Sequence, residues 1–399
     1  MPDNNSNEVQ TAWLSYAVGS AVVLVVLILC IAAFTLRAPI GDFFGRFMPA
    51  LQKGDVGPDQ SIENAKQAAA QGAFFESIQL SEPLVLAETP AMRSAARSTL
   101  ALSSFASGDE ESRINAVRIV KQDFLIVRSD LDRALAINKL LAYIMTGEDQ
   151  YIYDEVFTGE PFASYRVEGD WSGSLRKLAE FSLSFYETPQ ALQRVAFWYA
   201  ARLTNYDKKY SLSKGQKEEY IDQILALIAR IDGVYPGYER TLANRSYEYL
   251  LPTQHAFWKT YLYAVVAQSG RPEYLVQSKQ ALDELVRISE AAVDAEGNVI
   301  PLASISVPEA EFIYAKAVFL IKKEDGYEEV RYHLGRAVSV TEANPGLQEG
   351  TFIAIMRNAA LTPERHKIIP KLAALDPNFK VFLQKYGWKF DTATSTKTQ

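Results

Sequence analysis

The sequence predicts an all-α protein in which a transmembrane helix near the N-terminus precedes an array of antiparallel helix hairpins, an α-solenoid. Three observations lead to this prediction. Residues 16–36 contain no charged side chain. After residue 60, apolar residues recur almost throughout with the three-to-four-residue spacing of amphipathic helices. These helical stretches have similar lengths and are joined by short turns, which favours stacked hairpins.

The uncharged run from Tyr16 to Leu36 has the length of a membrane-spanning helix. It contains 21 residues, which rise about 31 Å in an α-helix, close to the hydrocarbon thickness of a bilayer. Trp13 and Tyr16 stand at its start, where aromatic rings favour the membrane interface. We therefore predict a short polar tail at 1–12 and an uncleaved transmembrane helix at 13–36, with the lipid bilayer as a partner.

The segment 37–60 is predicted to be a juxtamembrane amphipathic segment followed by a linker. Phe43, Phe44 and Phe47 share one face of a short helix, where their rings favour the membrane interface. The alternative is a linker whose aromatic rings pack on the following domain. Glycine and proline at Gly54 and Pro58 indicate that regular structure stops before the next domain begins.

The distribution of positive charge predicts the sidedness of this integral single-pass membrane protein. No Lys or Arg precedes the apolar run, whereas Arg37, Arg46 and Lys53 follow it. Positive flanks tend to stay in the cytoplasm, so the large domain is predicted to be cytoplasmic. The alternative is an extracytoplasmic domain, which is favoured by the lack of any cysteine after Cys30.

Residues 61–390 are predicted to form the helical-repeat domain. Ile221, Ile224 and Ile228 illustrate the pattern, because their spacing places them on one face of a helix that Gly233 and Pro236 are expected to end. The polar residues 391–399 are predicted to be disordered. The net charge of −7 gives no electrostatic reason to expect a nucleic-acid partner.

Two stretches near the C-terminus carry a family resemblance. Residues 373–379, Ala-Ala-Leu-Asp-Pro-Asn-Phe, resemble the end of a tetratricopeptide repeat, where a helix closes on Leu-Asp-Pro. Residues 328–346 resemble the second helix of another unit, with Ala337 as its small packing residue. The chain is similar to this family over about residues 310–380 and more loosely over 170–310. The resemblance implies a right-handed array of hairpins with a concave surface that binds a peptide or protein without catalysis.

The sequence contains no motif for metal or cofactor chemistry. Its three histidines, His255, His333 and His366, have no second His or Cys at ligand spacing, so no metal site is predicted. No nucleotide-binding glycine loop and no G-x-S-x-G nucleophile turn occurs. We therefore predict no cofactor and assign no catalytic residue, although the sequence leaves open whether the protein is an enzyme.

The segment 148–171 is the candidate binding element. It interleaves acids with aromatic rings, a combination that can hold sugars or cationic peptides, and paired acids in a cleft can hydrolyse a glycosidic bond. The alternative is a long ordered connection between helices, in which Trp171 or Tyr165 packs inward while the acids face water. The candidate binding residues are Tyr151, Tyr153, Asp154, Glu160, Tyr165 and Trp171.

A second aromatic group is spaced for helices rather than loops. It extends over residues 197–199 and 247–263, and both packing in the core and lining a ligand groove are compatible with its spacing. The whole sequence favours a membrane-anchored scaffold or adaptor that binds a protein or peptide partner without catalysis. The alternative is an α/α-toroid-like enzyme or binding protein that acts on glycans at the cell surface.

Overall fold

The computed structural model describes residues 58–390 except 71, 88, 148, 205–210, 243–249, 293–303, 305, 345–351, 353–354 and 356–364. The α-helices in this part of the chain are α3 (Pro58–Ala70), α4 (Phe74–Ser81), α5 (Pro90–Ala106), α6 (Glu110–Ile126), α7 (Asp130–Gly147), α8 (Gln150–Val156), α9 (Trp171–Phe185), α10 (Pro189–Leu203), α11 (Lys214–Leu242), α12 (Leu250–Gln268), α13 (Leu275–Ala291), α14 (Val307–Lys322), α15 (Tyr327–Ala343), α17 (Arg365–Leu375) and α18 (Pro377–Lys385). Short 3₁₀ turns join some of them, among them η2 (Phe162–Tyr165) and η3 (Pro272–Tyr274).

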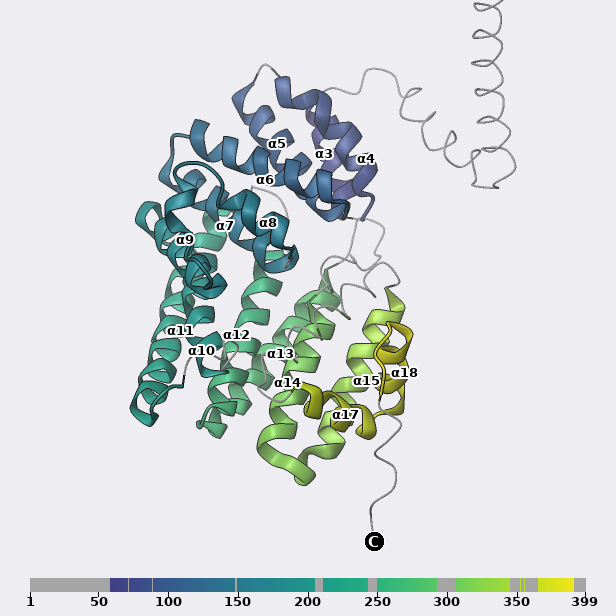
Figure 1. Ribbon diagram of the computed structural model, residues 1–399. Coiled ribbons are helices and arrows are strands. Elements are labelled where there is room, and N and C mark those ends of the chain that lie inside the picture. Colours follow the sequence, from purple (N-terminus) through teal and green to yellow (C-terminus); the bar gives the residue numbers. More distant parts are fainter. Residues whose placement is uncertain are drawn as a thin grey trace, which may run out of the picture. The chain divides into compact units, whose positions relative to one another are not determined.

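The all-α class is confirmed, and helices that are neighbours in the sequence pack together in pairs (Figure 1). The pairs with the most extensive contacts are α5 with α6, α9 with α10, α10 with α11, α12 with α13, and α14 with α15. Contacts of α10 with α12 and of α12 with α14 connect one pair to the next. This succession of packed hairpins is compatible with a helical-repeat solenoid.

The described helices do not include a transmembrane helix. Within the ranges that the structure describes, no helix combines the length and the apolar character needed to cross a bilayer. The longest of them, α11, has 29 residues but carries Glu218, Glu219 and Asp222 in its first half, and such charges are costly in hydrocarbon. The predicted fold class is therefore corrected: the described fold is all-α, without a transmembrane helix.

The predicted location of the protein is corrected for the same reason. The sequence predicts an integral single-pass membrane protein with its large domain on one side of the bilayer. That prediction is wrong for the described part of the chain, because none of its helices could cross a membrane. The predicted span at 13–36 and the proposed membrane-interface residues lie outside the described residues; these residues are Trp13, Tyr16, Phe43, Phe44 and Phe47. The tails at 1–12 and 391–399 also lie outside them. The predicted linker 37–60 overlaps α3, which begins at Pro58.

Several helices begin after a residue whose side chain caps them. Thr188 precedes Pro189, and its hydroxyl accepts a hydrogen bond from the Ala191 amide at 3.3 Å. Proline fits the first helical position because its missing N–H has no partner there. In the region that resembles a tetratricopeptide repeat, Asp376 caps α18 by accepting a hydrogen bond from the Phe379 amide at 2.9 Å, and Ala337 is fully buried.

Helix α11 continues beyond the point where it was expected to end. Ile221, Ile224 and Ile228 are buried as predicted, but the helix passes through Pro236 and extends to Leu242. A proline inside a helix removes one backbone hydrogen bond and usually kinks or ends it. Here Tyr238, two residues later, is only 2% exposed, and burying this large ring favours continued helix.

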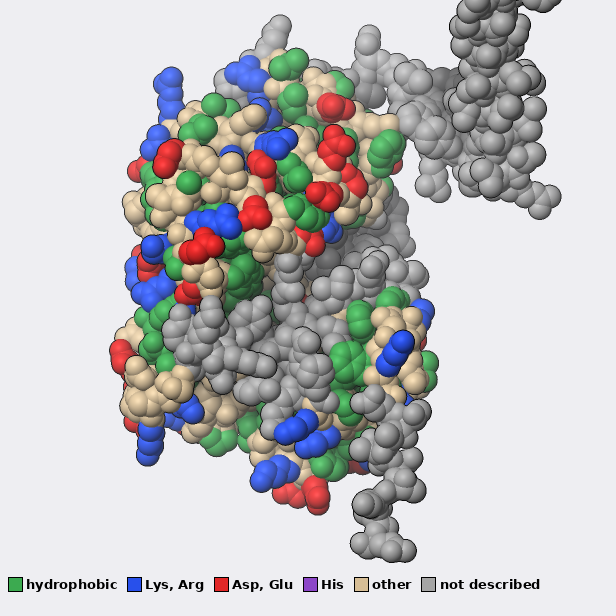
Figure 2. Space-filling model, in the orientation of Figure 1, with side chains coloured by type: hydrophobic (Ala, Val, Ile, Leu, Met, Phe, Trp, Pro, Cys, Tyr) green, Lys and Arg blue, Asp and Glu red, His purple; other side chains and the backbone are tan. Residues whose placement is uncertain are grey.

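The hydrophobic core includes a column of aromatic rings from helices distant in the sequence. Phe197 on α10 makes an edge-on contact with Trp258 on α12, with ring centroids 6.1 Å apart, and stacks on Tyr261 at 6.1 Å. These contacts hold α12 against α10 and so position the face of α12 that carries the candidate site. On the face shown in Figure 2, acidic and basic side chains are intermixed over the helices that lead up to α9.

Candidate functional site

A groove between α11, α12 and α13 is the candidate functional site of the array. Its volume is about 860 Å³, within the range of protein pockets that hold small organic ligands. Three helices supply its walls. The polar and aromatic side chains that line it are Tyr235 and Glu239 from α11, His255, Lys259 and Tyr263 from α12, and Gln277, Gln280, Glu284 and Arg287 from α13.

The helical period explains why α12 and α13 each direct one stripe of side chains into the groove. On α12, His255, Lys259 and Tyr263 follow each other at intervals of four residues, which places them on one side of the helix. On α13 the lining residues repeat every three or four positions in the same way. The opposite side of α13 carries Leu282 and Leu285, which are buried in the core.

A charged cluster ties α11 to α12 along one wall of the groove. His255 Nε2 lies 3.1 Å from Asp232 Oδ1, and Lys259 Nζ donates to the same carboxylate at 3.0 Å. The ring of Tyr235 stacks on the ring of His255, with centroids 4.0 Å apart and planes 13° from parallel. These contacts fix the orientation of His255 and of the Lys259 ammonium group.

Burial and neighbouring charges shift three pKa values around this wall. Partial burial would raise the pKa of the Asp232 carboxyl, but hydrogen bonds from His255 and Lys259 lower it overall below its ordinary value. Burial raises the pKa of the Tyr235 phenol well above its ordinary value, helped by the nearby Glu239. Burial also raises the pKa of Tyr263. Both phenols therefore stay neutral and able to donate a hydrogen bond at physiological pH.

Two buried polar atoms of the groove lining have no hydrogen-bond partner in the described part of the chain. They are His255 Nδ1 and Gln277 Oε1. Gln277 Oε1 is a hydrogen-bond acceptor, and so is His255 Nδ1 when the imidazole is neutral and its Nε2 donates to Asp232. Leaving a buried acceptor unpaired costs about 1–3 kcal/mol. A ligand that brought N–H groups to these atoms would recover part of this cost.

The groove presents several groups that can recognise a ligand. It offers hydrogen-bond acceptors, two tyrosine rings and an apolar floor that includes Ala281 and Ile288. The nearby cations, Lys259 and Arg287, are each held by a carboxylate. Among the described residues, no group of three or more His, Cys, Asp or Glu is arranged to hold a metal ion.

The predicted binding segment 148–171, which the structure describes from residue 149 on, is not one long connection. Residues 150–156 form the short helix α8, residues 162–165 form η2, and Trp171 is the first residue of α9. Tyr153 is only 7% exposed, and its hydroxyl lies 2.7 Å from the hydroxyl of Ser174 on α9. This helix was missed because seven residues are too few to give a clear periodic signal.

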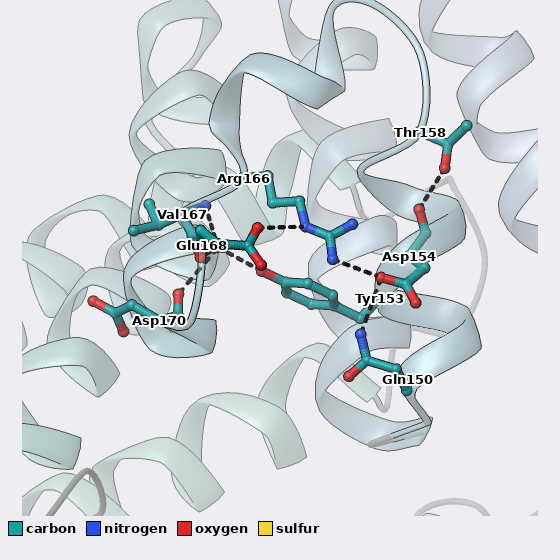
Figure 3. A network of polar contacts seen from close by, with 9 residues as sticks. Gln150, Tyr153, Asp154, Thr158, Arg166, Val167, Glu168 and Asp170 are labelled. Carbon is teal, nitrogen blue, oxygen red and sulfur yellow. Dashed lines mark hydrogen bonds and ion pairs between the residues drawn. The ribbon is translucent and has the colours of Figure 1, made fainter. Parts of the chain in front are cut away.

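Arg166 pairs with two acids of the segment (Figure 3), whereas Asp149, Glu155 and Asp170 pair with arginines outside it. Arg166 lies over the Tyr153 ring at 5.2 Å and contacts Asp154 at 2.9 Å and Glu168 at 3.8 Å. The Gln150 amide also donates to Asp154, at 3.0 Å. Arg166 thus contacts both Tyr153 and Asp154 of α8 and leaves the Asp154 carboxylate only partly available to a ligand.

The other four predicted site residues have separate neighbours. The Tyr151 hydroxyl donates to Asp149 at 2.9 Å, and Glu160 is exposed to solvent. Tyr165 stacks on Phe181, with centroids 4.4 Å apart, and Trp171 makes an edge-on contact with Phe197 at 6.0 Å. In the sequence, nothing in this acidic, aromatic segment distinguishes rings that anchor it from rings that bind a ligand.

Sequence reasoning missed the groove, although one local signal was present. Tyr263 belongs to the second aromatic group, for which a ligand groove was one of two interpretations, and its spacing from His255 and Lys259 is helical. The residues that complete the groove beside His255, Lys259 and Tyr263 come from other helices. Asp232 on α11 pairs with His255, and Gln277 on α13 lines the groove. No pattern within α12 indicates them.

No protein-family model, no curated protein and no solved structure matches this chain.

Proposed function

We propose that the protein is a helical-repeat scaffold or adaptor, similar to tetratricopeptide-repeat proteins, which binds a peptide segment of a protein partner in the groove between α11, α12 and α13. The observation that carries the proposal is the groove itself, with its volume of about 860 Å³ and its two unpaired buried acceptors. Backbone amides of an extended peptide are donors that these acceptors lack, and aromatic rings are suited to hold its side chains.

The packing order of the helices supports this proposal. Successive hairpins contact their neighbours in the chain, as they do in arrays whose surface grooves bind peptides. The alternative function on glycans needs two carboxylates free to act on one bond. Asp154 is held by Arg166 and Gln150, so the segment 148–171 gives this alternative no support.

Site-specific photo-crosslinking tests the proposal in cells that express the full chain. A photoreactive amino acid replaces Gln280, an exposed residue of the groove lining, and in a second strain it replaces Glu290, an exposed residue of α13 outside the lining. The proposal predicts an adduct from position 280 that maps to one contiguous segment of another protein. Equal adducts from both positions, or none from position 280, would overturn it.

A blocking variant makes the assignment to the groove specific. Ile288 is half-buried in the lining, so the Ile288→Arg variant fills the groove with a long charged side chain. A synthetic peptide with the sequence of the mapped segment should bind the wild-type chain and lose at least about tenfold in affinity with this variant, because a packed contact worth 1.4 kcal/mol or more is blocked. Circular dichroism of both proteins shows whether the helical fold is retained.

A further inference from the structure

Glu239 has an unusual place among the charged groups of the groove. It is a half-buried residue of α11 that lines the groove, and its carboxylate accepts a hydrogen bond from the Tyr235 hydroxyl at 3.2 Å. Within the described part of the chain, no lysine, arginine or histidine lies within ion-pair distance of it. Among the described residues, the groove therefore carries one negative charge without a counter-charge.

The cations nearby are already engaged. Lys259 Nζ donates a hydrogen bond to each carboxylate oxygen of Asp232. Arg287 makes two hydrogen bonds to Glu284, at 2.6 and 2.9 Å, and this pairing lowers the pKa of the Glu284 carboxyl. Neither Lys259 nor Arg287 is therefore free to pair with Glu239 in place of a cationic ligand.

The described lining also holds two buried polar atoms that lack a hydrogen-bond partner. Gln277 Oε1 and His255 Nδ1 are buried without a partner among the described residues, and both line the same groove as Glu239. A guanidinium group has five N–H donors, no acceptor and a planar shape that stacks on aromatic rings. An ammonium group concentrates its donors at one point and cannot span two separate acceptors as well.

We propose that the groove recognises an arginine side chain of the partner peptide, with Glu239 as the countercharge, Gln277 as a neutral acceptor and the tyrosine rings of the lining as stacking surfaces. This inference rests on the proposed function, since it assigns the chemistry of the segment that the groove binds. It predicts that the positive charge of the ligand, and not only its shape, determines affinity.

Citrulline provides the matched ligand control, because it has the shape of arginine but no charge. The probes are the blocked tripeptides acetyl-Ala-Arg-Ala-amide and acetyl-Ala-citrulline-Ala-amide. They are titrated into the full chain with 3-fluorotyrosine at position 263 only, and binding is followed by the fluorine chemical shift. The arginine probe should bind at least about fivefold more tightly than the citrulline probe, since hydrogen bonds between charged groups exceed neutral ones by about 1 kcal/mol.

Two variants locate the effect. Glu239→Gln keeps an acceptor for the Tyr235 hydroxyl but removes the charge, and it should abolish the preference for arginine. Glu290→Gln removes an exposed charge of α13 outside the groove lining and should leave the preference unchanged. Equal binding of both probes, a preference that survives Glu239→Gln, or no saturable shift with either probe would overturn the inference.

The outcome is separable from that of the proposed function. Crosslinking from position 280 does not depend on Glu239 or on arginine. A mapped segment without arginine, together with equal binding of the two probes, would remove the inference and leave the scaffold function standing. Charge-dependent binding of the arginine probe without any crosslinked segment would remove the scaffold function and leave a site for a small guanidinium compound.

Discussion

Arg202 on α10 and Asp170 before α9 form a nearly buried ion pair, with Arg202 Nη2 and Asp170 Oδ2 2.7 Å apart and their side chains 5% and 16% exposed. The other carboxylate oxygen of Asp170 accepts a hydrogen bond from the Gly173 amide at 2.8 Å. One carboxylate thus caps α9 and connects it to α10. The Arg202 guanidinium also lies over the Trp198 ring at 5.0 Å, which fixes it from the other side.

Replacing Gly173 by alanine should break this connection. A methyl group built on Gly173 would lie 2.4 Å from Asp170 Oδ2, so the carboxylate must move away from both the helix cap and Arg202. We expect the free energy of unfolding, measured with urea, to fall by about 2–4 kcal/mol. Gly335→Ala is the matched control, because its methyl meets only Asp376 Oδ2 at 3.5 Å, and alanine should stabilise helix α15 by about 0.5–1 kcal/mol.

The acids of the segment 148–171 should contribute little to stability. The double variant Asp154→Asn, Glu160→Gln removes one half-exposed ion pair and one exposed charge, and exposed pairs contribute at most about 1 kcal/mol. Trp171→Ala should lower the unfolding free energy by about 1.5–3 kcal/mol, because the ring loses its packing on Phe197. Thermal unfolding that ranked the double variant below Trp171→Ala would show that these acids are structural.

The buried contact between Glu311 and His333 should be strongly coupled. Their side chains are 1% and 3% exposed, His333 Nδ1 contacts Glu311 Oε2, and Arg336 Nε lies 3.2 Å from Glu311 Oε1. Removing His333 alone, as His333→Leu, should cost about 3 kcal/mol because it leaves a buried carboxylate less well paired. Adding Glu311→Leu should recover part of that loss.

A double-mutant cycle in urea measures this coupling. We expect an interaction energy of at least about 1 kcal/mol between positions 311 and 333. The exposed pair of Lys279 and Asp283, which is four residues apart on α13, is the control and should give less than about 0.5 kcal/mol. Additive effects at 311 and 333 would contradict the expectation.

Lys316 should make the protein more stable at alkaline pH. The residue is 3% exposed, and burial lowers its pKa to about 7. An unfolded chain, in which lysine keeps its ordinary pKa of about 10.4, binds more protons than the folded chain between these two values. Stability therefore rises as the pH increases from about 7 towards 10.

The Lys316→Met variant isolates this contribution. It should be more stable than the wild-type chain by its largest margin below about pH 7, where the buried ammonium is charged in the folded state, and the margin should shrink by up to about 1.4 kcal/mol per pH unit above that. Urea titrations of both proteins at pH 6.5, 8 and 9 measure the margin. A margin that does not depend on pH would contradict the prediction.

The parts of the fold that could be predicted are those that a single helix determines. The stripe of Ile221, Ile224 and Ile228 indicates a helix because its spacing is local, and Thr188 marks a helix start because the hydroxyl bonds an amide three residues away. Pro236 gave the wrong end for α11. A local rule about proline was outweighed by the burial of Tyr238, which depends on neighbouring helices.

The candidate site could not be predicted because it is assembled from three helices. His255 and Lys259 are four residues apart and indicate a shared face, but their counter-charge, Asp232, lies more than 20 residues earlier. In contrast, the segment 148–171 is conspicuous in the sequence because its acids and rings are contiguous. In the structure, Arg166 lies over the Tyr153 ring, and the Tyr153 hydroxyl contacts Ser174 on α9. These neighbouring residues therefore pack the segment against the array.

Pro236 also gives the groove wall a built-in weak point. Since proline has no amide hydrogen, the carbonyl of Asp232 lacks the helical partner that would join it to the following turn. The last turns of α11, Gly237–Leu242, include Glu239. They are therefore joined to the preceding turns by one backbone hydrogen bond fewer than in an ordinary helix. In hydrogen-exchange terms, we expect these amides to be less protected than those of the isoleucine face, although the buried Tyr238 ring still holds this turn to its neighbours. Local opening of this turn would move Glu239 while the isoleucine face of α11 stays packed.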